Sequence, residues 1–133
     1  MRPGHSVPGM EVSGDRIFSA QAGPVPHLAE NGKIVSFRAG DPSVKFEASG
    51  GQLLVDVEIG GGKTFGLAQG FFDPASPEGS PAQPNTGALL KKGPGRTFRT
   101  VTSNLDRPTS VEIIGRDAYV VTIPGQILKI RVD

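Results

Sequence analysis

Several residue types that often reveal a protein's chemistry are scarce or missing in this chain. The 133 residues include no cysteine, no tryptophan and only two histidines. The lack of cysteine excludes disulfide bonds, thiolate zinc sites and a cysteine nucleophile. The 14 basic residues nearly balance the 13 acidic ones, so the net charge gives no general attraction for nucleic acid or acidic membranes. We therefore expect neither nucleic acid nor a membrane as a partner.

Long apolar runs are also missing. No segment approaches the roughly 18 apolar residues of a membrane-spanning helix, and Met1–His5 lacks the apolar centre of an export signal. From the sequence alone we expect a soluble chain that is not exported. No window sustains the apolar spacing of an amphipathic helix, and the nearest approach is the short stretch His27–Glu30. Almost no helix is therefore predicted.

Glycine and proline, by contrast, are abundant. The 19 glycines and 12 prolines lie mainly at turn positions between short runs of alternating apolar and polar residues. This pattern is typical of an all-β protein with many short strands. The length of 133 residues fits one domain, because domains usually span roughly 100–200 residues.

The most informative feature is a sequence motif that occurs three times. Each copy opens with a strand-like run that carries a glutamate at the same place, namely Glu11, Glu58 and Glu112. Glu58 follows Glu11 by 47 residues, and Glu112 follows Glu58 by 54 residues. These periods are close to the roughly 40–50 residues of a four-stranded propeller blade. The sequence therefore predicts an all-β propeller with three repeats.

The repeats set the boundaries of the predicted blades. The first blade is expected at about residues 5–49, the second at about 50–104 and the third at 105–133, all within one domain. The first two copies contain four predicted strands, whereas the third ends after three. Residues Met1–Val7 of a second copy are one candidate for the missing strand, although the proline in this segment suits only an edge position. Otherwise the basic residues of the last strand are expected to protect the open edge.

Three blades do not complete a propeller, whose rings typically contain four to eight blades. Both end faces of a three-bladed arc would be bare and apolar, and large apolar patches are abnormal in a monomer. Twofold closure gives six blades, so we expect a C2 homodimer that forms one six-bladed ring. The apolar residues expected on the two end faces are Met10, Val12, Val111, Ile113, Tyr119 and Val121.

Three segments resemble a known family. They are LDRPTSVEIIGRDAYVVTIPGQILKI at Leu105–Ile130, PEGSPAQPNTGALL at Pro77–Leu90 and AGPVPHLAENGKIVSF at Ala22–Phe37. They are similar to the β-propeller proteins named after scytonemin gene clusters, the ScyD/ScyE-like family. The resemblance implies a propeller fold but no defined activity. Members of that family usually carry an export signal and a complete ring in one polypeptide, whereas this chain has about half of a ring, so its localisation stays open.

More distant six-bladed propellers suggest a chemistry. Paraoxonases, gluconolactonases and diisopropylfluorophosphatases hold calcium in the central tunnel and hydrolyse lactones or phosphotriesters. For this chain the likeness implies a metal-dependent hydrolase of the phosphotriesterase, lactonase or esterase type, by analogy of fold alone.

The repeated glutamates are the first candidates for a site. On the second copy, strand alternation sets Leu54, Asp56 and Glu58 on the side opposite Val57. A carboxylate on such a strand is best placed facing the tunnel, because burial without a partner costs several kcal/mol. Glu11, Glu58 and Glu112 are therefore predicted to be ligands of a divalent metal, with calcium favoured by the oxygen donors.

A different interpretation of the same glutamates stays open. They can line a solvated tunnel, or pair with basic residues such as Arg107 or Lys63. Asn104 and Asp106, in the link that enters the third blade, are secondary candidates for metal or substrate contacts at the same end.

Two long loops are expected at the tunnel mouth. They run through Ala22–Asn31 and Gly70–Thr86, and each can either wall a pocket or pack on itself as a rigid surface loop. His27 in the shorter loop and Asp56 are the candidate catalytic residues for proton transfer, although lone histidines are often bystanders. The candidate substrate contacts in the longer loop are Phe71, Phe72, Asp73 and Asn85.

Two hypotheses of function follow from these features. The first is a dimeric propeller with a divalent cation in its tunnel, which hydrolyses an ester-like substrate such as a lactone, aryl ester or phosphotriester by Lewis-acid activation. The second is a binding or scaffold module without chemistry, which uses the loop-bearing face for a small molecule, a sugar or a protein.

Overall fold

The computed structural model describes residues 9–133, and these residues form eleven strands with two single-turn 3₁₀ helices. The prediction of an all-β chain with almost no helix is confirmed. Residues 5–8 of the first predicted blade lie outside the described residues, as does the segment Met1–Val7 that was a candidate to complete the third sheet. Within residues 9–133, no helix is long and apolar enough to cross a membrane.

The strands form three antiparallel sheets that follow one another along the chain. The first sheet contains β1 (Met10–Ser13), β2 (Arg16–Gln21), β3 (Lys33–Arg38) and β4 (Lys45–Ser49). The second contains β5 (Leu54–Gly60), β6 (Lys63–Ala68), β7 (Gly87–Lys92) and β8 (Phe98–Leu105). The third contains β9 (Pro108–Ile114), β10 (Asp117–Thr122) and β11 (Ile127–Arg131). The two 3₁₀ helices are η1 (Ala29–Asn31) and η2 (Pro94–Arg96).

Each sheet is a meander whose strands are joined in sequence order. Most of the connections are short turns, whereas long loops join β2 to β3 and β6 to β7. The turn between β5 and β6 shows how the sequence permits this. Gly61 and Gly62 both have positive φ, which glycine adopts at little cost. The stretch Gly60–Thr64, which superficially resembles a phosphate-binding loop, is therefore a hairpin turn.

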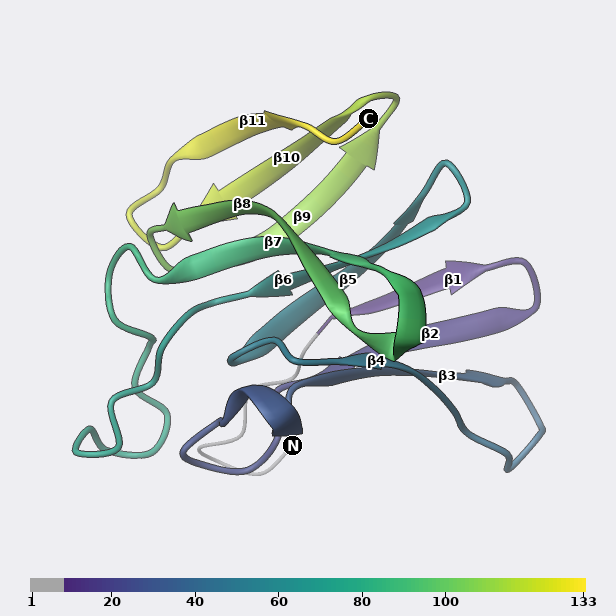
Figure 1. Ribbon diagram of the computed structural model, residues 1–133, viewed down its shortest axis with the longest axis horizontal. Coiled ribbons are helices and arrows are strands. Elements are labelled where there is room, and N and C mark those ends of the chain that lie inside the picture. The colour runs from purple at the N-terminus through teal and green to yellow at the C-terminus, as the bar shows by residue number, and fades with distance from the viewer. Residues whose placement is uncertain (1–8) are drawn as a thin grey trace.

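The three sheets fan out from their first strands. β1, β5 and β9 lie side by side, and the later strands of each sheet extend outward from this centre (Figure 1). This is a propeller-like arrangement, with the first strand of each repeat innermost. Within residues 9–133 the fan is an open arc with two end faces, one on the first sheet and one on the third.

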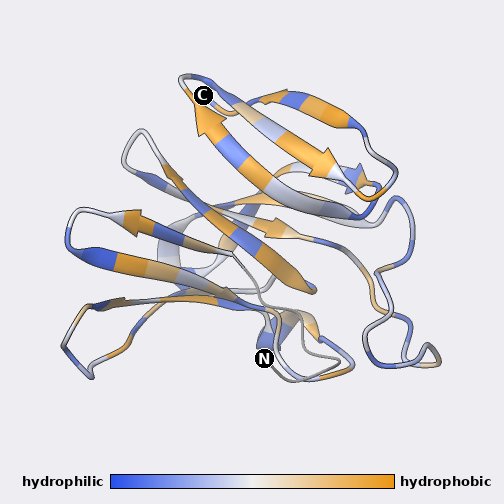
Figure 2. Cartoon of the chain, turned by 180° about the vertical axis from the view of Figure 1, so that it is seen from behind, coloured by the Kyte–Doolittle hydropathy of each residue, from blue (hydrophilic) through white to orange (hydrophobic). Residues whose placement is uncertain are grey.

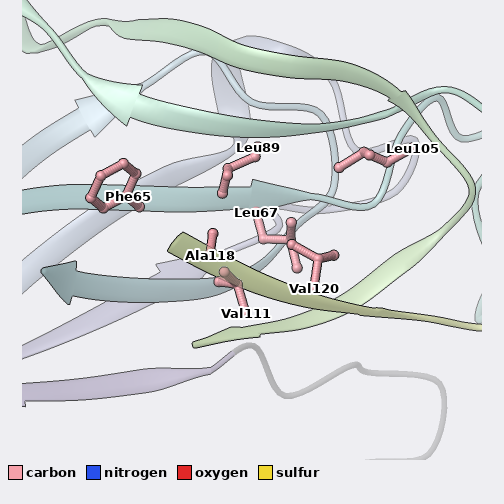
Figure 3. Packing of buried hydrophobic residues seen from close by; sticks show 7 residues of the cluster. All are labelled: Phe65, Leu67, Leu89, Leu105, Val111, Ala118 and Val120. Atoms are coloured by element: carbon pink, nitrogen blue, oxygen red, sulfur yellow. The ribbon is translucent and has the colours of Figure 1, made fainter. Parts of the chain in front are cut away.

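Apolar packing joins the second and third sheets. Phe65, Leu67 and Leu89 of the second sheet are almost fully buried against the third sheet. Their partners include Val111, Ala118 and Val120, as Figure 3 shows. Full burial of each large side chain contributes about 1.5–3 kcal/mol, so this cluster holds the two sheets in a fixed orientation.

A β-bulge changes the packing between the first and second sheets. The register of β5 against β6 shifts between Leu54 and Asp56. The extra residue reverses the alternation, so Leu54 packs together with Val57 against Ala20 and Ile34 of the first sheet. The prediction that Leu54 shares a side with Asp56 and Glu58 was therefore wrong, because an uninterrupted alternation was assumed.

The end faces differ in part from the prediction. Met10 and Val12 are exposed on the first sheet, and Val121 is exposed on the third, as expected. Val111 and Ile113, however, point inward and pack in the cluster with the second sheet. The exposed residues of β9 are instead the ones that alternate with them, namely Ser110, Glu112 and Ile114. Figure 2 colours the chain by hydropathy, and its orange segments mark apolar residues on the strands of the first and third sheets.

A buried ion pair reinforces the junction of the first and second sheets. Glu47 on β4 is almost fully buried, and Lys92 of β7 donates to Glu47 Oε1 at 2.7 Å. Ser36 donates to the other carboxylate oxygen at 2.6 Å. Burial alone would raise the pKa of Glu47, but the bonds from Lys92 and Ser36 hold that pKa below its ordinary value. The carboxylate is therefore charged and satisfied.

Removal of the lysine from this pair is expected to destabilise the chain. Lys92→Met leaves a buried carboxylate without its closest cation, which costs about 3 kcal/mol in the free energy of unfolding. Lys45→Met is the matched control, because Lys45 is exposed and lies 3.8 Å from the same carboxylate, so it contributes at most about 1 kcal/mol. Urea unfolding at one protein concentration measures both variants. Equal losses in the two variants would contradict the role given to Lys92.

Candidate functional site

A cavity of about 480 Å³ lies where the innermost strands meet. Four carboxylates reach it: Glu11 from β1, Asp56 and Glu58 from β5, and Glu112 from β9. The structure thus brings together the three repeated glutamates and one candidate proton acceptor. The other lining residues are Met10, Ser110, Val111, Tyr119, Val121 and Ile127.

Asp56 bridges two innermost strands. Its Oδ1 accepts the N–H of Val57 on the same strand, and its Oδ2 accepts the N–H of Val111 on β9, both at 2.9 Å. Burial raises the pKa of Asp56 above its ordinary value. The two amide bonds oppose this shift, whereas the nearby charges of Glu11 and Glu112 add to it.

Glu58 is the most deeply placed of the four carboxylates, with only 6% of its surface exposed. Its Oε1 accepts the N–H of Ile113 on β9 at 3.2 Å. Burial, together with a hydrogen bond to the Glu11 carboxyl group, raises the pKa of Glu58 to about 8. At neutral pH Glu58 therefore keeps its proton, because burial and the neighbouring acidic groups disfavour its charged form.

The strand registers show where each glutamate points, since directly paired residues of an antiparallel sheet share one face. Glu11 pairs with Phe18, which packs toward the second sheet. Glu58 pairs with Phe65, which packs toward the third sheet. Each of these two glutamates thus leans toward the sheet that follows it. The prediction from the sequence placed these glutamates facing the tunnel and did not include their lean toward the following sheet.

The donor set suits a hard cation, although its side chains are not grouped into a ready-made metal site. Within residues 9–133, no three carboxylate or imidazole side chains are grouped so that they hold a metal ion. Both oxygens of Asp56 and one of Glu58 already accept backbone N–H groups. The remaining carboxylate oxygens suit calcium better than zinc. A cation bound here would need further oxygen ligands, which water or another chain can supply.

The candidate catalytic residue His27 lies elsewhere. It is in the loop between β2 and β3, where its Nδ1 lies 3.0 Å from the carbonyl oxygen of Gly23. Its ring packs edge-on against the buried Phe72, with 5.0 Å between the ring centroids. His27 does not line the carboxylate cavity. The structure thus joins the two long loops through His27 and Phe72 but does not pair His27 with Asp56.

The other candidates of the long loop are mainly in turns. Phe71 is exposed, and its N–H donates to Thr86 Oγ1 at 2.8 Å. Asp73 accepts the N–H of Ala75 at 2.9 Å. Such local bonds rigidify a loop that contains several prolines.

The end of β8 and the link into the third sheet hold the remaining candidates, Asn104 and Asp106. Asn104 is exposed and has a positive φ. Asp106 pairs with Arg107, and that guanidinium holds the pKa of Asp106 below its ordinary value. The N–H of Asn85 also donates to Asp106, so this carboxylate fastens the end of the long loop to the link.

A second cavity opens among the loops. It has a volume of about 360 Å³ and contains no charged side chain among its lining residues, which are Leu53, Val55, Gln69, Gly79, Ser80, Pro81 and Ile123. Gln69 Oε1 accepts the N–H of Ala82 at 2.9 Å. This bond fixes the amide group at the edge of the cavity.

Sequence reasoning missed the apolar part of the carboxylate cavity. Tyr119, Met10 and Ile127 line it together with the acids. Met10 precedes Glu11 in the sequence and Tyr119 pairs with Glu112 on the neighbouring strand, whereas Ile127 lies two strands away from Glu112. The side of the strand on which these residues lie depends on the strand registers, which the sequence alone does not give.

Comparisons with known proteins add little to this geometry. The sequence matches no protein-family profile and no curated protein. Among solved structures, the crystal structure of the computationally designed Ika4 protein matches with a TM-score of 0.45 and 8% sequence identity. The match covers 96% of this chain and 92% of that chain. A likeness at this score carries no inference about fold or function.

Proposed function

We propose that this chain is one half of a six-bladed β-propeller, which closes as a C2 homodimer and binds a divalent cation in its carboxylate-lined tunnel. The observation that carries the proposal is the composition of the two end faces. They present apolar residues at positions that the junction between the second and third sheets buries wholly or in part. Membership of the scytonemin-cluster propeller family is part of the proposal and rests on the resemblance of the repeats.

The end face of the third sheet repeats the buried face of the second. The strand pairs place Tyr119 where the second sheet has Phe65, and Ile127 where it has Leu89. Leu89 is 0% exposed beneath the third sheet, whereas Ile127 is 72% exposed. The third sheet thus presents a surface for a following blade, and such a surface favours association.

The end face of the first sheet repeats the other side of the same junction. Met10 stands where the third sheet has Val111, which is 4% exposed, yet Met10 is 63% exposed. Val12 likewise corresponds to Ile113. A second copy that sets its first sheet on the third sheet of its partner covers both faces at once. The two junctions are equivalent by twofold symmetry.

Ring closure also supplies the missing cation donors. Two copies bring six repeated glutamates into one tunnel, and Glu11, Glu58 and Glu112 are the proposed ligands. A bound divalent cation would polarise the carbonyl or phosphoryl oxygen of an ester-like substrate. Asp56 stands beside these ligands, and its raised pKa suits it to hold or accept a proton.

Calcium titration of the purified dimer tests the tunnel site. The wild-type protein is expected to bind calcium, and Glu58→Gln is expected to weaken that binding at least about 10-fold, since it removes an anionic ligand. The affinity is expected to rise between pH 6 and pH 9, because a cation must displace the proton held by Glu58. Isothermal titration at several pH values measures both effects.

Glu78→Gln is the matched control, because Glu78 is an exposed glutamate of the long loop. Unchanged calcium binding in Glu58→Gln, or the lack of binding by wild-type protein at millimolar calcium, would overturn the cation site. A panel of lactones, aryl esters and phosphotriesters, run with and without a chelator, tests the hydrolase. Hydrolysis that neither chelation nor Glu58→Gln alters would exclude the cation-dependent reaction.

The loop cavity favours a second candidate function. Its uncharged lining of apolar groups, one amide and one hydroxyl suits a neutral small molecule. In this alternative the propeller is a binding module without chemistry. The same panel separates the two candidates, because a pure binding module turns over none of the substrates.

A further inference from the structure

The junction between the second and third sheets contains two carboxylate-to-amide bonds. Asp56 accepts the N–H of Val111, and Glu58 accepts the N–H of Ile113. Both donors lie on the inner edge of β9, where no further strand of a sheet can pair with them. Unpaired amides on a strand edge are costly when water is excluded. At this junction the acids of the second sheet therefore satisfy the inner edge of the third sheet.

The same geometry exists, incomplete, at the end of the arc. Glu112 holds in β9 the position that Glu58 holds in β5, and its paired residue Tyr119 stands where Phe65 does. Glu112 is exposed and leans away from the second sheet. Within residues 9–133 it accepts no hydrogen bond. Its carboxylate thus points to the place where a following blade would present an amide.

The matching amide lies on the first sheet. Ile113, the donor to Glu58, follows Glu112 by one residue, and Val12 follows Glu11 in the same way. The N–H of Val12 is not used in the sheet and donates at 3.2 Å to Glu11 Oε1, the carboxylate of its own neighbour. This bond is exposed. The Val12 amide is therefore free to exchange that acceptor for a better one.

We infer that Glu112 of one copy accepts the N–H of the partner's Val12 and so sets the register of each junction in the closed ring. This inference rests on the proposed function, because it requires the second copy. It extends that proposal by naming the polar contact that makes the closure specific. Apolar surfaces alone favour contact, but they do not distinguish one strand register from the next.

The position next to this bond differs between the two junctions. At the internal junction, a Cβ atom at Gly60 would clash with the Ile113 side chain, so the lack of a side chain there permits the close approach. The residue at the position of Gly60 in the third sheet is Ile114, which is exposed. Closure in the inferred register therefore requires Ile114 and the partner's Val12 to pack at a wider spacing than Gly60 and Ile113.

The test compares three variants in a chelator, so that a cation does not contribute. Glu112→Ala removes the acceptor and is expected to weaken dimerisation about 100-fold, because each of the two junctions loses a charge-assisted bond that contributes roughly 10-fold. Glu112→Gln retains an acceptor oxygen and is expected to recover part of the loss. Glu30→Ala, at an exposed glutamate of η1, is the control. Sedimentation equilibrium measures the dissociation constants.

Hydrogen exchange at a single amide gives a second readout. The Val12 amide is expected to exchange slowly in the wild-type dimer and at least about 10-fold faster in Glu112→Ala at concentrations that keep the variant dimeric. A dimer whose dissociation constant and Val12 exchange are both unchanged in Glu112→Ala would overturn this inference but leave the ring intact. A wild-type protein that stays monomeric would overturn the ring itself.

Discussion

Replacement of Val12 by aspartate is expected to convert the dimer into a monomer. Val12 lies on the end face of the first sheet and is exposed in the single chain, so the variant should fold normally. In the closed ring the new carboxylate would be buried against apolar residues of the third sheet. An unpaired buried charge costs several kcal/mol, and the ring contains two such junctions. The dissociation constant should rise at least about 1,000-fold.

Light scattering after gel filtration measures this change. The wild-type protein should elute with about twice the chain mass of 13.9 kDa, and Val12→Asp with the chain mass itself. Leu28→Asp is the control, because Leu28 is an exposed apolar residue of a loop outside the end faces. If Val12→Asp stays dimeric at the concentrations used for the wild-type protein, the closed ring is wrong.

The second large effect is a loss of stability as the pH rises. The pKa of Glu58 is raised to about 8 in the folded chain from an ordinary value of 4.5. Between these values the folded state keeps a proton that the unfolded state has released. Stability therefore falls with rising pH across this window, by up to about 1.4 kcal/mol per pH unit. The raised pKa of Asp56 adds to the same trend.

Glu58→Gln should flatten this dependence, because the amide does not titrate. Urea unfolding in a chelator between pH 5 and pH 8.5 measures the free energy of unfolding. The wild-type protein should lose a few kcal/mol more than the variant over this range. Val12→Asp provides a monomeric background in which changes of association do not contribute. Parallel pH profiles of wild type and Glu58→Gln would show that Glu58 does not hold the proton.

The fold could be predicted from the sequence because the three repeats show the same pattern of strands and turns. Three copies of one alternating pattern with glycine-rich turns predict three antiparallel sheets, since each copy supports the same interpretation. The bulge in β5 was not readable. Nothing in the stretch Leu54–Asp56 marks it, and it follows from packing against two different neighbours. The direction of Leu54 was therefore mistaken.

The candidate site was predictable in composition but not in geometry. The recurrence of Glu11, Glu58 and Glu112 indicated that the acids gather near the axis. Their amide partners could not be predicted, because Glu58 and Ile113 are 55 residues apart and their contact depends on how two sheets stack. The same holds for Glu47 and Lys92, which are 45 residues apart. In each case a tertiary contact decides which polar group is satisfied.

The two outer surfaces of the arc are complementary to each other and not to themselves. Such a subunit adds copies head to tail, and the angle between adjacent sheets alone determines where the growing assembly meets its own beginning. Sheets that splay slightly more or less would give larger circles or open helical polymers from the same contacts. The tight approach of the β5 hairpin to β9, which the lack of a side chain at Gly60 permits, is one place where this curvature is set.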